Sequence, residues 1–365
     1  SSASGPTGRL TPLQIAPPPD SLAQAIDHLK TAKRPVIIVG HGARFTMEPI
    51  IALADMLNAP VLTTFKGKGQ ISDHHPLGCG VLGRSGTPIA SWFMNEADLL
   101  LVLGASFSNH TSIDPGKPII QVDFDPLALG KFHPVTVPVW GEISVVVEQL
   151  RSALQGQTTT DDQRPEIAQR WSMWREEKKR REQDDRGNGI NSAAIFAAMT
   201  RQVPANAVIS VDVGNNTYSF GRYFECEAQS VLMSGYLGSI GFGFPGAMGA
   251  WAAAGHERPI VSVSGDGGFG QYMGEFTTAV KYGMNISHIL LNNSELGKIS
   301  KEQRAGEWDV WQTSLHNPSF AKFAEICGGK GIQVTEKAAL DEAIAEALVY
   351  AGPAIVEVMA DVNLI

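Results

Sequence analysis

Short apolar runs alternate with segments of helical spacing along almost the whole chain, and this alternation limits the folds that the chain can adopt. Runs typical of buried strands cover residues 35–39, 60–64, 99–103, 118–123, 207–213, 259–264, 286–292 and 353–359. Helical spacing covers residues 22–29, 49–57, 90–97, 195–203, 241–254, 276–282 and 340–350. Strands that alternate with helices form parallel, doubly wound sheets. The sequence therefore predicts an α/β fold with two Rossmann-like domains.

Changes in composition divide the 365 residues into four segments. Residues 1–20 are small, polar and proline-rich, and we interpret them as a linker or a cloning remnant without a secretory signal. We expect the first domain to span 21–155. Residues 156–190 carry dense mixed charge, which favours an exposed helix between domains over a partner-binding helix. The second domain is expected to span 191–365.

The composition excludes several classes of protein. Asp plus Glu is 37 against 29 Lys plus Arg, a net charge of −8, which disfavours nucleic acid and anionic membranes as partners. No apolar run reaches the roughly 20 residues of a membrane span. Cys79, Cys226 and Cys327 are odd in number and far apart, which argues against a disulfide framework or a structural zinc site. We therefore expect a reducing, cytoplasmic setting.

Polar residues follow two of the predicted strands at the positions where those strands end. Residues 265–268 read Gly-Asp-Gly-Gly, and residues 292–295 read Asn-Asn-Ser-Glu, with Asn293 placed 293 − 266 = 27 positions after Asp266. Adjacent parallel strands bring their carboxyl ends together, so the two side-chain oxygens are expected to meet. One carboxylate, one amide oxygen and a backbone carbonyl suit Mg²⁺ that is bound mainly through a ligand's phosphates. Taken alone, the first motif is weak evidence for a site, and it favours a sharp, plain turn at 265–268.

Together the two motifs resemble the thiamine diphosphate enzymes of the pyruvate oxidase and acetolactate synthase family. The resemblance covers nearly the whole chain after residue 20. It implies that Asp266 and Asn293 bind Mg²⁺ through their side chains and Glu295 through its backbone carbonyl, with Asn292 supporting the loop. The residues that it assigns to thiamine diphosphate are Gly214, Asn215, Asn216, Gly238, Ser239, Ile240, Gly267, Gly268, Leu296 and Gly297.

Two of these segments carry particular roles in the family. The loop at 211–216 receives the diphosphate, and Ile240 takes the position of an apolar wedge. The wedge bends thiamine so that its 4′-amino group reaches the C2 proton. Without the resemblance, Ile240 would be interpreted as a core residue, and Asp212 as a turn or helix-capping residue.

The first domain resembles the family's middle domain, which holds FAD in pyruvate oxidases and acetolactate synthases. Glycine-containing turns follow its strands, and an acidic residue at a strand end can accept hydrogen bonds from a ribose or adenine. The residues assigned to FAD are Gly40, Gly42, Arg44, Thr64, Lys66, Gly104, Ser106, Asp123 and Asp125. Binding of ADP, or of no nucleotide, is the alternative. His41 is expected to be an ordinary loop residue.

Two positions after Gly297 bear on catalysis. Lys298 stands where the family often has a large apolar side chain, so it either binds a substrate carboxylate or points to solvent. Glu302 matches an acidic residue near the active centre of pyruvate oxidases, and with Ile240 it is a candidate catalytic residue. As a plain helix residue, Glu302 would lie on the surface.

The family's pyrimidine domain has no counterpart in this sequence. In relatives that domain supplies a glutamate that protonates N1′ of the aminopyrimidine. We therefore expect the chain to be a fragment, or one half of a two-chain enzyme, and inactive alone. The pyrimidine domain would come from a missing N-terminal part or from another chain, within a homodimer or homotetramer.

The resemblance predicts a reaction on a small 2-oxo acid. The leading prediction is decarboxylation of pyruvate or a related 2-oxo acid, dependent on thiamine diphosphate and Mg²⁺, with electron transfer to FAD. The residues at 292–297 and 123–126 favour this oxidase reaction. The alternatives are carboligation of the acetolactate synthase type and a noncatalytic nucleotide-binding fragment.

Overall fold

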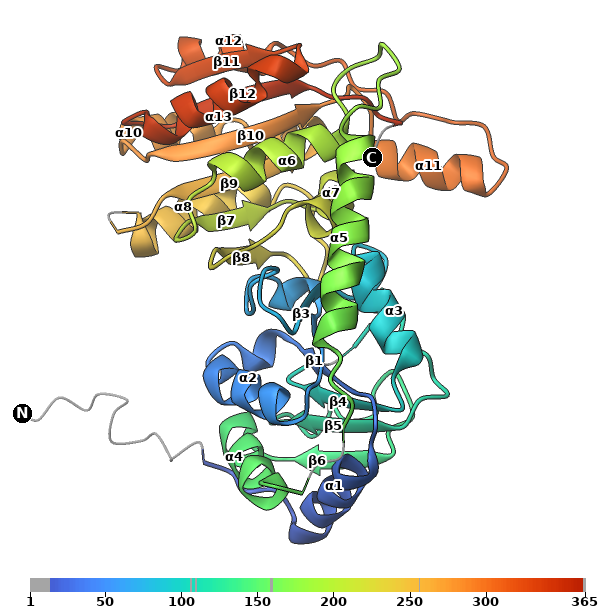
Figure 1. Ribbon diagram of the computed structural model, residues 1–365. Coiled ribbons are helices and arrows are strands. Elements are labelled where there is room, and N and C mark those ends of the chain that lie inside the picture. The colour runs from blue at the N-terminus through green and yellow to red at the C-terminus, as the bar shows by residue number, and fades with distance from the viewer. Residues whose placement is uncertain (1–13, 106, 109, 158–159, 256, 364–365) are drawn as a thin grey trace, which may run out of the picture.

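The computed structural model describes residues 14–363, except 106, 109, 158–159 and 256. It contains two six-stranded sheets in which every strand pairing is parallel. The first sheet has the order β3-β2-β1-β4-β5-β6 and the second the order β11-β12-β10-β9-β7-β8. The predicted class, two doubly wound α/β units, is confirmed. In Figure 1 the two sheets lie one above the other.

The first sheet is built from β1 (Pro35–Val39), β2 (Val61–Thr63), β3 (Gly78–Val81), β4 (Leu99–Leu103), β5 (Ile119–Asp123) and β6 (Val137–Trp140). Its helices are α1 (Pro19–Thr31), α2 (Met47–Met56), α3 (Pro88–Glu96) and α4 (Ile143–Leu154). Every residue of β1 and β4 is buried, as expected for strands covered on both faces. Helix α4 packs against both α1 and α2.

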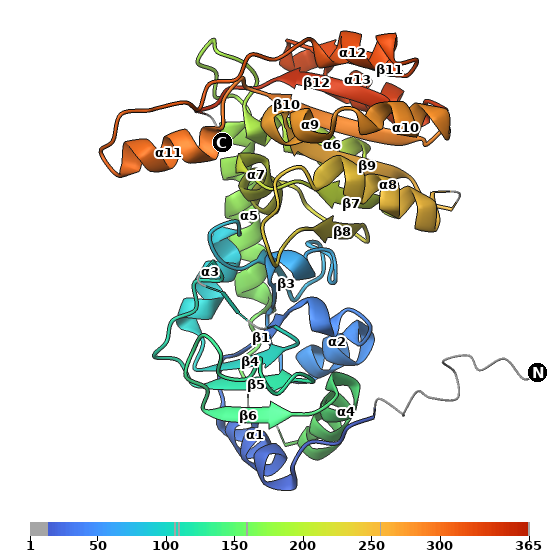
Figure 2. The same cartoon turned by 180° about the vertical axis from the view of Figure 1, so that it is seen from behind.

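The second sheet is built from β7 (Val208–Val211), β8 (Ser230–Met233), β9 (Ile260–Gly265), β10 (Ile286–Asn292), β11 (Lys330–Val334) and β12 (Ala354–Met359). Its helices are α6 (Ser192–Gln202), α7 (Asn215–Tyr223), α8 (Gly243–Ala254), α9 (Asp266–Tyr272), α10 (Glu275–Lys281), α11 (Gly297–Ala305), α12 (Phe320–Ile326) and α13 (Leu340–Val349). Phenylalanines from α8, α9, α10 and α12 form one apolar cluster, and Figure 2 shows α8, α9 and α10 on the face of the sheet opposite to α6.

The structure differs from the sequence prediction at particular places. The sequence pattern misses β3, β6, β8 and β11, which are the edge strands of the two sheets. An edge strand is only partly covered, and β6 alternates between buried and exposed residues rather than forming a continuous apolar run. The sharp turn expected at 265–268 is wrong, because Gly265 ends β9 and α9 begins at Asp266.

The charged segment forms α5 (Arg164–Arg181), which runs beside both sheets in Figure 1. The expectation of an exposed linking helix is wrong for one of its faces. Trp171 and Trp174 are buried, and the indole N–H of Trp171 donates to the carbonyl of Gly78 at 2.8 Å. Two large aromatic side chains on one face make α5 part of the core.

Buried charges hold the two domains together around α5. Glu225, which follows α7, accepts a hydrogen bond from Arg175 at 2.8 Å and contacts the ammonium of Lys178. Arg175 also donates to the carbonyl of Asp73 at 3.4 Å. The buried Asp73 carboxylate pairs with Lys68 at 3.1 Å and accepts the N–H of Cys226 at 2.8 Å. The interface between the domains therefore contains a paired polar cluster beside apolar packing, such as the contact between Phe65 and Phe220.

We expect Glu225→Gln to lower the free energy of unfolding by about 3 kcal/mol at pH 7, because two cations on α5 lose their buried counter-charge. Urea denaturation followed by tryptophan fluorescence measures the change. Glu227→Gln, an exposed neighbour, is the control and is expected to change stability by less than about 0.5 kcal/mol. Equal stability of the two variants would contradict a structural role for this cluster.

Candidate functional site

A cavity of about 390 Å³ lies at the carboxyl ends of β7, β9, β10 and β12. The structure brings most of the predicted thiamine diphosphate and metal residues into its wall: Gly214, Asn215, Asn216, Ile240, Asp266, Gly267, Gly268, Asn293, Glu295, Leu296 and Gly297. Three predicted residues, Gly238, Ser239 and Glu302, are not part of this wall. The cavity wall also contains three residues that were not predicted from the sequence: Ser192, Gln271 and Asp361.

Asp266 is buried at the start of α9, and its carboxylate accepts hydrogen bonds from neutral groups. Its Oδ2 atom accepts the backbone N–H of Ser294 at 2.7 Å and the side-chain amide of Asn317 at 2.6 Å, while Oδ1 accepts the N–H of Gly267 at 3.0 Å. Burial raises the pKa of Asp266, although these hydrogen bonds act in the opposite direction. Asn317 was missed in the sequence because no strand end or motif marks it.

The two adjacent asparagines have different surroundings. Asn292 is buried, donates to Glu357 at 2.8 Å and accepts from Asn317 at 3.0 Å, so its side chain links β10 to β12 and to the loop before α12. Asn293 lines the cavity, and its Oδ1 atom accepts the N–H of Glu295 at 3.1 Å. Within the described residues there is no cluster of three His, Cys, Asp or Glu side chains suited to a metal. A cation at Asp266 and Asn293 would meet oxygen donors, which suit Mg²⁺ when phosphates and water complete its coordination.

Asp212, immediately after β7, organises the loop that carries Ile240. Its Oδ1 atom accepts three backbone N–H groups, from Val213 at 2.7 Å, Gly241 at 2.8 Å and Phe242 at 3.0 Å. Its carboxylate is fully buried, and this burial raises the pKa of Asp212 to about 6. Asp212 therefore joins two loops that are distant in sequence. A turn residue or a helix-capping residue would contact only its own segment of the chain.

Glycine is required where α9 passes close to Asp212. A Cβ atom at position 268 would lie 2.1 Å from Oδ2 of Asp212, and one at position 267 would lie 2.7 Å from the side chain of Leu296. A Cβ atom at position 270, in the same helix, would meet nothing within 4 Å. The glycines at 267 and 268 thus allow the helix to approach the cavity wall.

The remaining residues predicted at this site lie at its edge or outside it. Ile240 is 38% exposed and lines the cavity, so its interpretation as a core residue is excluded. The N–H of Ser239 donates to Ser234 at 3.1 Å. Lys298 lines the cavity, lies 5.5 Å from the ring centroid of Tyr218 and pairs with the exposed carboxylate of Glu302. Glu302 does not line the cavity, and its role as a catalytic residue stays a prediction.

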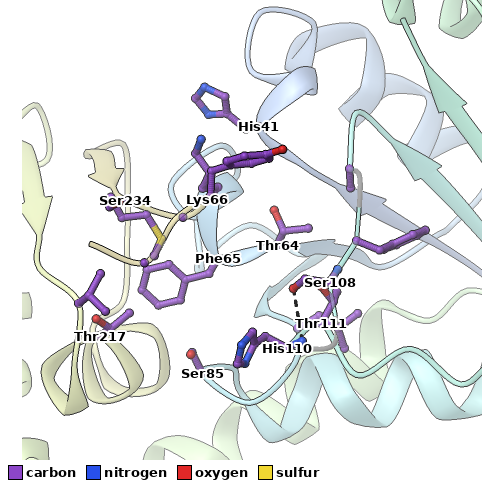
Figure 3. A pocket seen from close by; sticks show the side chains of 18 of the residues that line it. His41, Thr64, Phe65, Lys66, Ser85, Ser108, His110, Thr111, Thr217 and Ser234 are labelled. Atoms are coloured by element: carbon purple, nitrogen blue, oxygen red, sulfur yellow. Dashed lines mark hydrogen bonds between the residues drawn. The ribbon is translucent and has the colours of Figure 1, made fainter. Parts of the chain in front are cut away.

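A second cavity, of about 650 Å³, lies between the two domains, and Figure 3 shows its wall. Of the residues predicted to bind FAD, Thr64, Lys66 and Gly104 line it. Gly238, which was predicted to bind thiamine diphosphate, lines this second cavity instead. Gly40, Gly42, Arg44, Asp123 and Asp125 are not part of the wall, and Ser106 lies outside the described residues.

Local packing accounts for the predicted residues that do not line the second cavity. A Cβ atom at Gly40 would lie 2.2 Å from the carbonyl oxygen of Gly104, so this glycine allows two strand ends to meet. Asp123 and Asp125 accept backbone N–H groups two residues further along, each at 2.9 Å. Their carboxylates thus stabilise local turns.

Basic side chains face the second cavity from the first domain. His41, Lys66, His110 and Lys131 all line it. Burial lowers the pKa of His41, and the charges of Arg44 and Lys66 lower it further. The placement of His41 in the wall differs from its expected role as an ordinary loop residue. The two lysine ammonium groups in the wall favour a ligand that carries phosphate or another anion.

The fold and the cavity define a doubly wound α/β protein, a class in which ligands bind at the carboxyl ends of the strands, where this cavity lies. Comparison with known families narrows this class. Residues 22–150 match the family model "Thiamine pyrophosphate enzyme, central domain", and residues 212–358 match "Thiamine pyrophosphate enzyme, C-terminal TPP binding domain". The chain belongs to the thiamine pyrophosphate enzymes of the acetolactate synthase and pyruvate oxidase family, as the sequence resemblance predicted.

Curated relatives align with nearly all of the chain. YdaP of Bacillus subtilis (strain 168), which is named as a thiamine pyrophosphate-containing protein, is 34% identical over 351 residues, covering 94% of this chain and 60% of YdaP. The acetolactate synthase large subunit of Haemophilus influenzae is 31% identical, covering 89% of this chain and 58% of the relative. The acetolactate synthase isozyme 3 large subunit of Escherichia coli (strain K12) is 28% identical, covering 90% of this chain and 59% of the relative. The chain thus spans about three fifths of the length of these relatives.

Among the described residues, no helix combines the length and the apolar character needed to cross a membrane.

We expect Gly268→Ala to lower the free energy of unfolding by about 2 kcal/mol, because the new methyl group would overlap the buried carboxylate of Asp212. Gly270→Ala, in the same helix, is the matched control and is expected to be neutral or stabilising by up to about 1 kcal/mol. Thermal or urea unfolding measures both variants. Similar effects at the two positions would contradict the close packing between α9 and Asp212.

The raised pKa of Asp212 predicts a pH dependence of stability. Ionisation of this carboxyl is easier in the unfolded chain, with a pKa near 3.8, than in the folded chain, with a pKa of about 6. The charge therefore lowers stability increasingly as pH rises from about 4 to 6. This cost is about 3 kcal/mol at pH 7 and falls by about 2 kcal/mol between pH 7 and pH 4. Asp212→Asn keeps an acceptor oxygen and removes this contribution. We expect the difference in unfolding free energy between variant and wild type to change by that amount between pH 7 and 4; a constant difference would contradict the assignment.

Proposed function

We propose that this chain provides the metal- and diphosphate-binding part of a thiamine diphosphate-dependent enzyme that acts on a 2-oxo acid, with carboligation of the acetolactate synthase type as its reaction. The observation that carries the proposal is the cavity where Asp266 and Asn293 meet at adjacent strand ends. The names of several relatives favour carboligation over the FAD-linked oxidation of pyruvate that the sequence predicted. Oxidation is the second candidate, and the presence of a second cavity with a basic wall is compatible with it.

The residues at the cavity fit a hydrated Mg²⁺ diphosphate. In this proposal Asp266 and Asn293 bind the cation through side-chain oxygens, and Glu295 through its backbone carbonyl. The buried amide nitrogen of Asn215 has no hydrogen-bond partner in the described structure, and a phosphate oxygen would supply one. The chemistry that thiamine diphosphate supplies when bound is an electron sink for decarboxylation of the 2-oxo acid.

The chain's own side chains orient the cofactor and limit access to it. The three N–H groups bonded to Asp212 fix the backbone next to Ile240, which places this apolar side chain at the cavity. Ile240 would support the cofactor as a wedge. Lys298 stands at the same cavity and provides a cation for a substrate carboxylate, with its charge partly balanced by Glu302.

A further domain would complete the site. Three exposed apolar side chains lie near the Ile240 loop. Tyr236 and Leu237 precede Ile240 in the sequence, and Tyr272 contacts the loop. We propose that a pyrimidine domain, from another part of the protein or from a second copy in a homodimer or homotetramer, covers them. The second cavity would hold the phosphates of FAD against Lys66 and Lys131. Two buried free thiols, Cys79 and Cys226, support a cytoplasmic location.

The test uses the product of the complete open reading frame that encodes this chain, supplied with pyruvate, thiamine diphosphate and Mg²⁺. We expect acetolactate as the product. Asp266→Asn should raise the Mg²⁺ concentration for half-maximal activity at least about tenfold, because a charged ligand becomes a neutral one. Asp341→Asn, which changes an ion pair with Arg201 at the surface, is the control.

The same experiment distinguishes the second candidate. Anaerobic bleaching of a bound flavin by pyruvate, without acetolactate, would contradict carboligation and favour oxidation. Absence of any flavin absorbance from the purified protein would contradict the placement of FAD in the second cavity.

A further inference from the structure

The inner wall of the first cavity contains a carboxylate that none of the roles above uses. Asp361 lies two residues after the end of β12, is 2% exposed and lines the cavity. Its Oδ1 atom accepts the N–H of Asn363 at 2.8 Å, whereas its Oδ2 atom is buried without a hydrogen-bond partner among the described residues. Leaving a buried carboxylate oxygen unpaired is costly, so this atom points to a donor that the described residues do not supply.

Backbone contacts hold Asp361 in place without any ligand. Its N–H donates to the carbonyl of Ile190 at 3.0 Å, and the N–H of Ile190 donates to Met359 at 2.8 Å. The adjacent Ala360 forms a parallel bridge with Ile190 and donates to the carbonyl of Asn292 at 2.9 Å. The carboxylate is therefore positioned from both β10 and the segment before α6.

An unpaired donor lines the same cavity. The side-chain Nδ2 atom of Asn215, the first residue of α7, is buried without a partner. A Cβ atom at Gly297 would lie 2.6 Å from this atom and 3.7 Å from Nδ2 of Asn293. Asn215 and Asn293 thus converge on the same point of the wall, which also contains Asp361.

The pair of open groups restricts the ligand. A molecule that satisfies both must donate to Asp361 and accept from Asn215. A phosphate anion alone would be repelled by Asp361, and a cation alone would leave the amide of Asn215 unpaired. Mg²⁺ normally keeps several water molecules when phosphates bind it, so a hydrated Mg²⁺ diphosphate carries both O–H donors and oxygen acceptors.

We propose that Asp361 is a positioning residue of the metal site, which accepts a hydrogen bond from a water molecule of the hydrated cation while Asn215 donates to a diphosphate oxygen. The inference rests on the proposed function and deepens it. It adds a carboxylate from β12 to the ligands expected from β9 and β10, so that three neighbouring strands of the sheet hold the cation. Partners that orient the ligands of a metal in this way typically change its affinity by about 10–100-fold.

The test measures Mn²⁺ binding by electron paramagnetic resonance, with thiamine diphosphate present, on the product of the complete open reading frame. We expect Asp361→Asn to raise the Kd of Mn²⁺ about tenfold, while the melting temperature without metal changes by less than about 2 °C. Asp114→Asn is the matched control, because Asp114 also accepts the N–H two residues ahead, at 2.9 Å, but lies exposed in the first domain. Its Kd should equal that of the wild type.

Two results separate the hypotheses. A Kd for Asp361→Asn within about twofold of the wild-type value would overturn the role of Asp361 and leave the proposed function intact. Failure of the wild type to bind Mn²⁺ with thiamine diphosphate would overturn the proposed function and this inference with it. If Asp361→Asn does not fold, Asp361→Ser, which keeps an acceptor for Asn363, is measured against the same limits.

Discussion

The site depends on one constraint, the common direction of the strands in the second sheet. Because β7, β9, β10 and β12 are parallel neighbours, their carboxyl ends lie along one edge of the sheet. A polar residue follows each of these ends: Asp212, Asp266, Asn293 and Asp361. Asp266, Asn293 and Asp361, which are up to 361 − 266 = 95 positions apart, are thereby placed around one cavity, and Asp212 holds the adjoining loop that carries Ile240.

Burial of a carboxylate has different consequences at Asp212 and at Asp266. Asp212 is surrounded by backbone N–H groups and has a raised pKa, so it stabilises a loop at a cost in electrostatic free energy. Asp266 faces the cavity with neutral donors around it, and a bound cation would favour its ionised form. Sites of function commonly retain such unfavourable charges because a ligand compensates for them.

The two domains form one continuous structure through α5. The tryptophans of this helix are buried, and its Arg175 and Lys178 neutralise Glu225 of the second domain. Direct contacts from Asp73 to Cys226 strengthen the junction. The cavity between the domains takes residues from both, so its shape depends on this junction.

The sequence by itself determined the α/β class, the central strands, and the two motifs whose residues line the first cavity. Central strands are covered on both faces and must be apolar throughout, which a pattern can reveal. The edge strands, the buried face of α5, and the partners Asn317 and Asp361 could not be predicted in this way. Their roles depend on packing and on contacts between distant segments, such as the closeness of Gly268 to Asp212. Only the tertiary structure decided these, because burial and hydrogen bonding at one residue are set by neighbours that its local sequence does not contain.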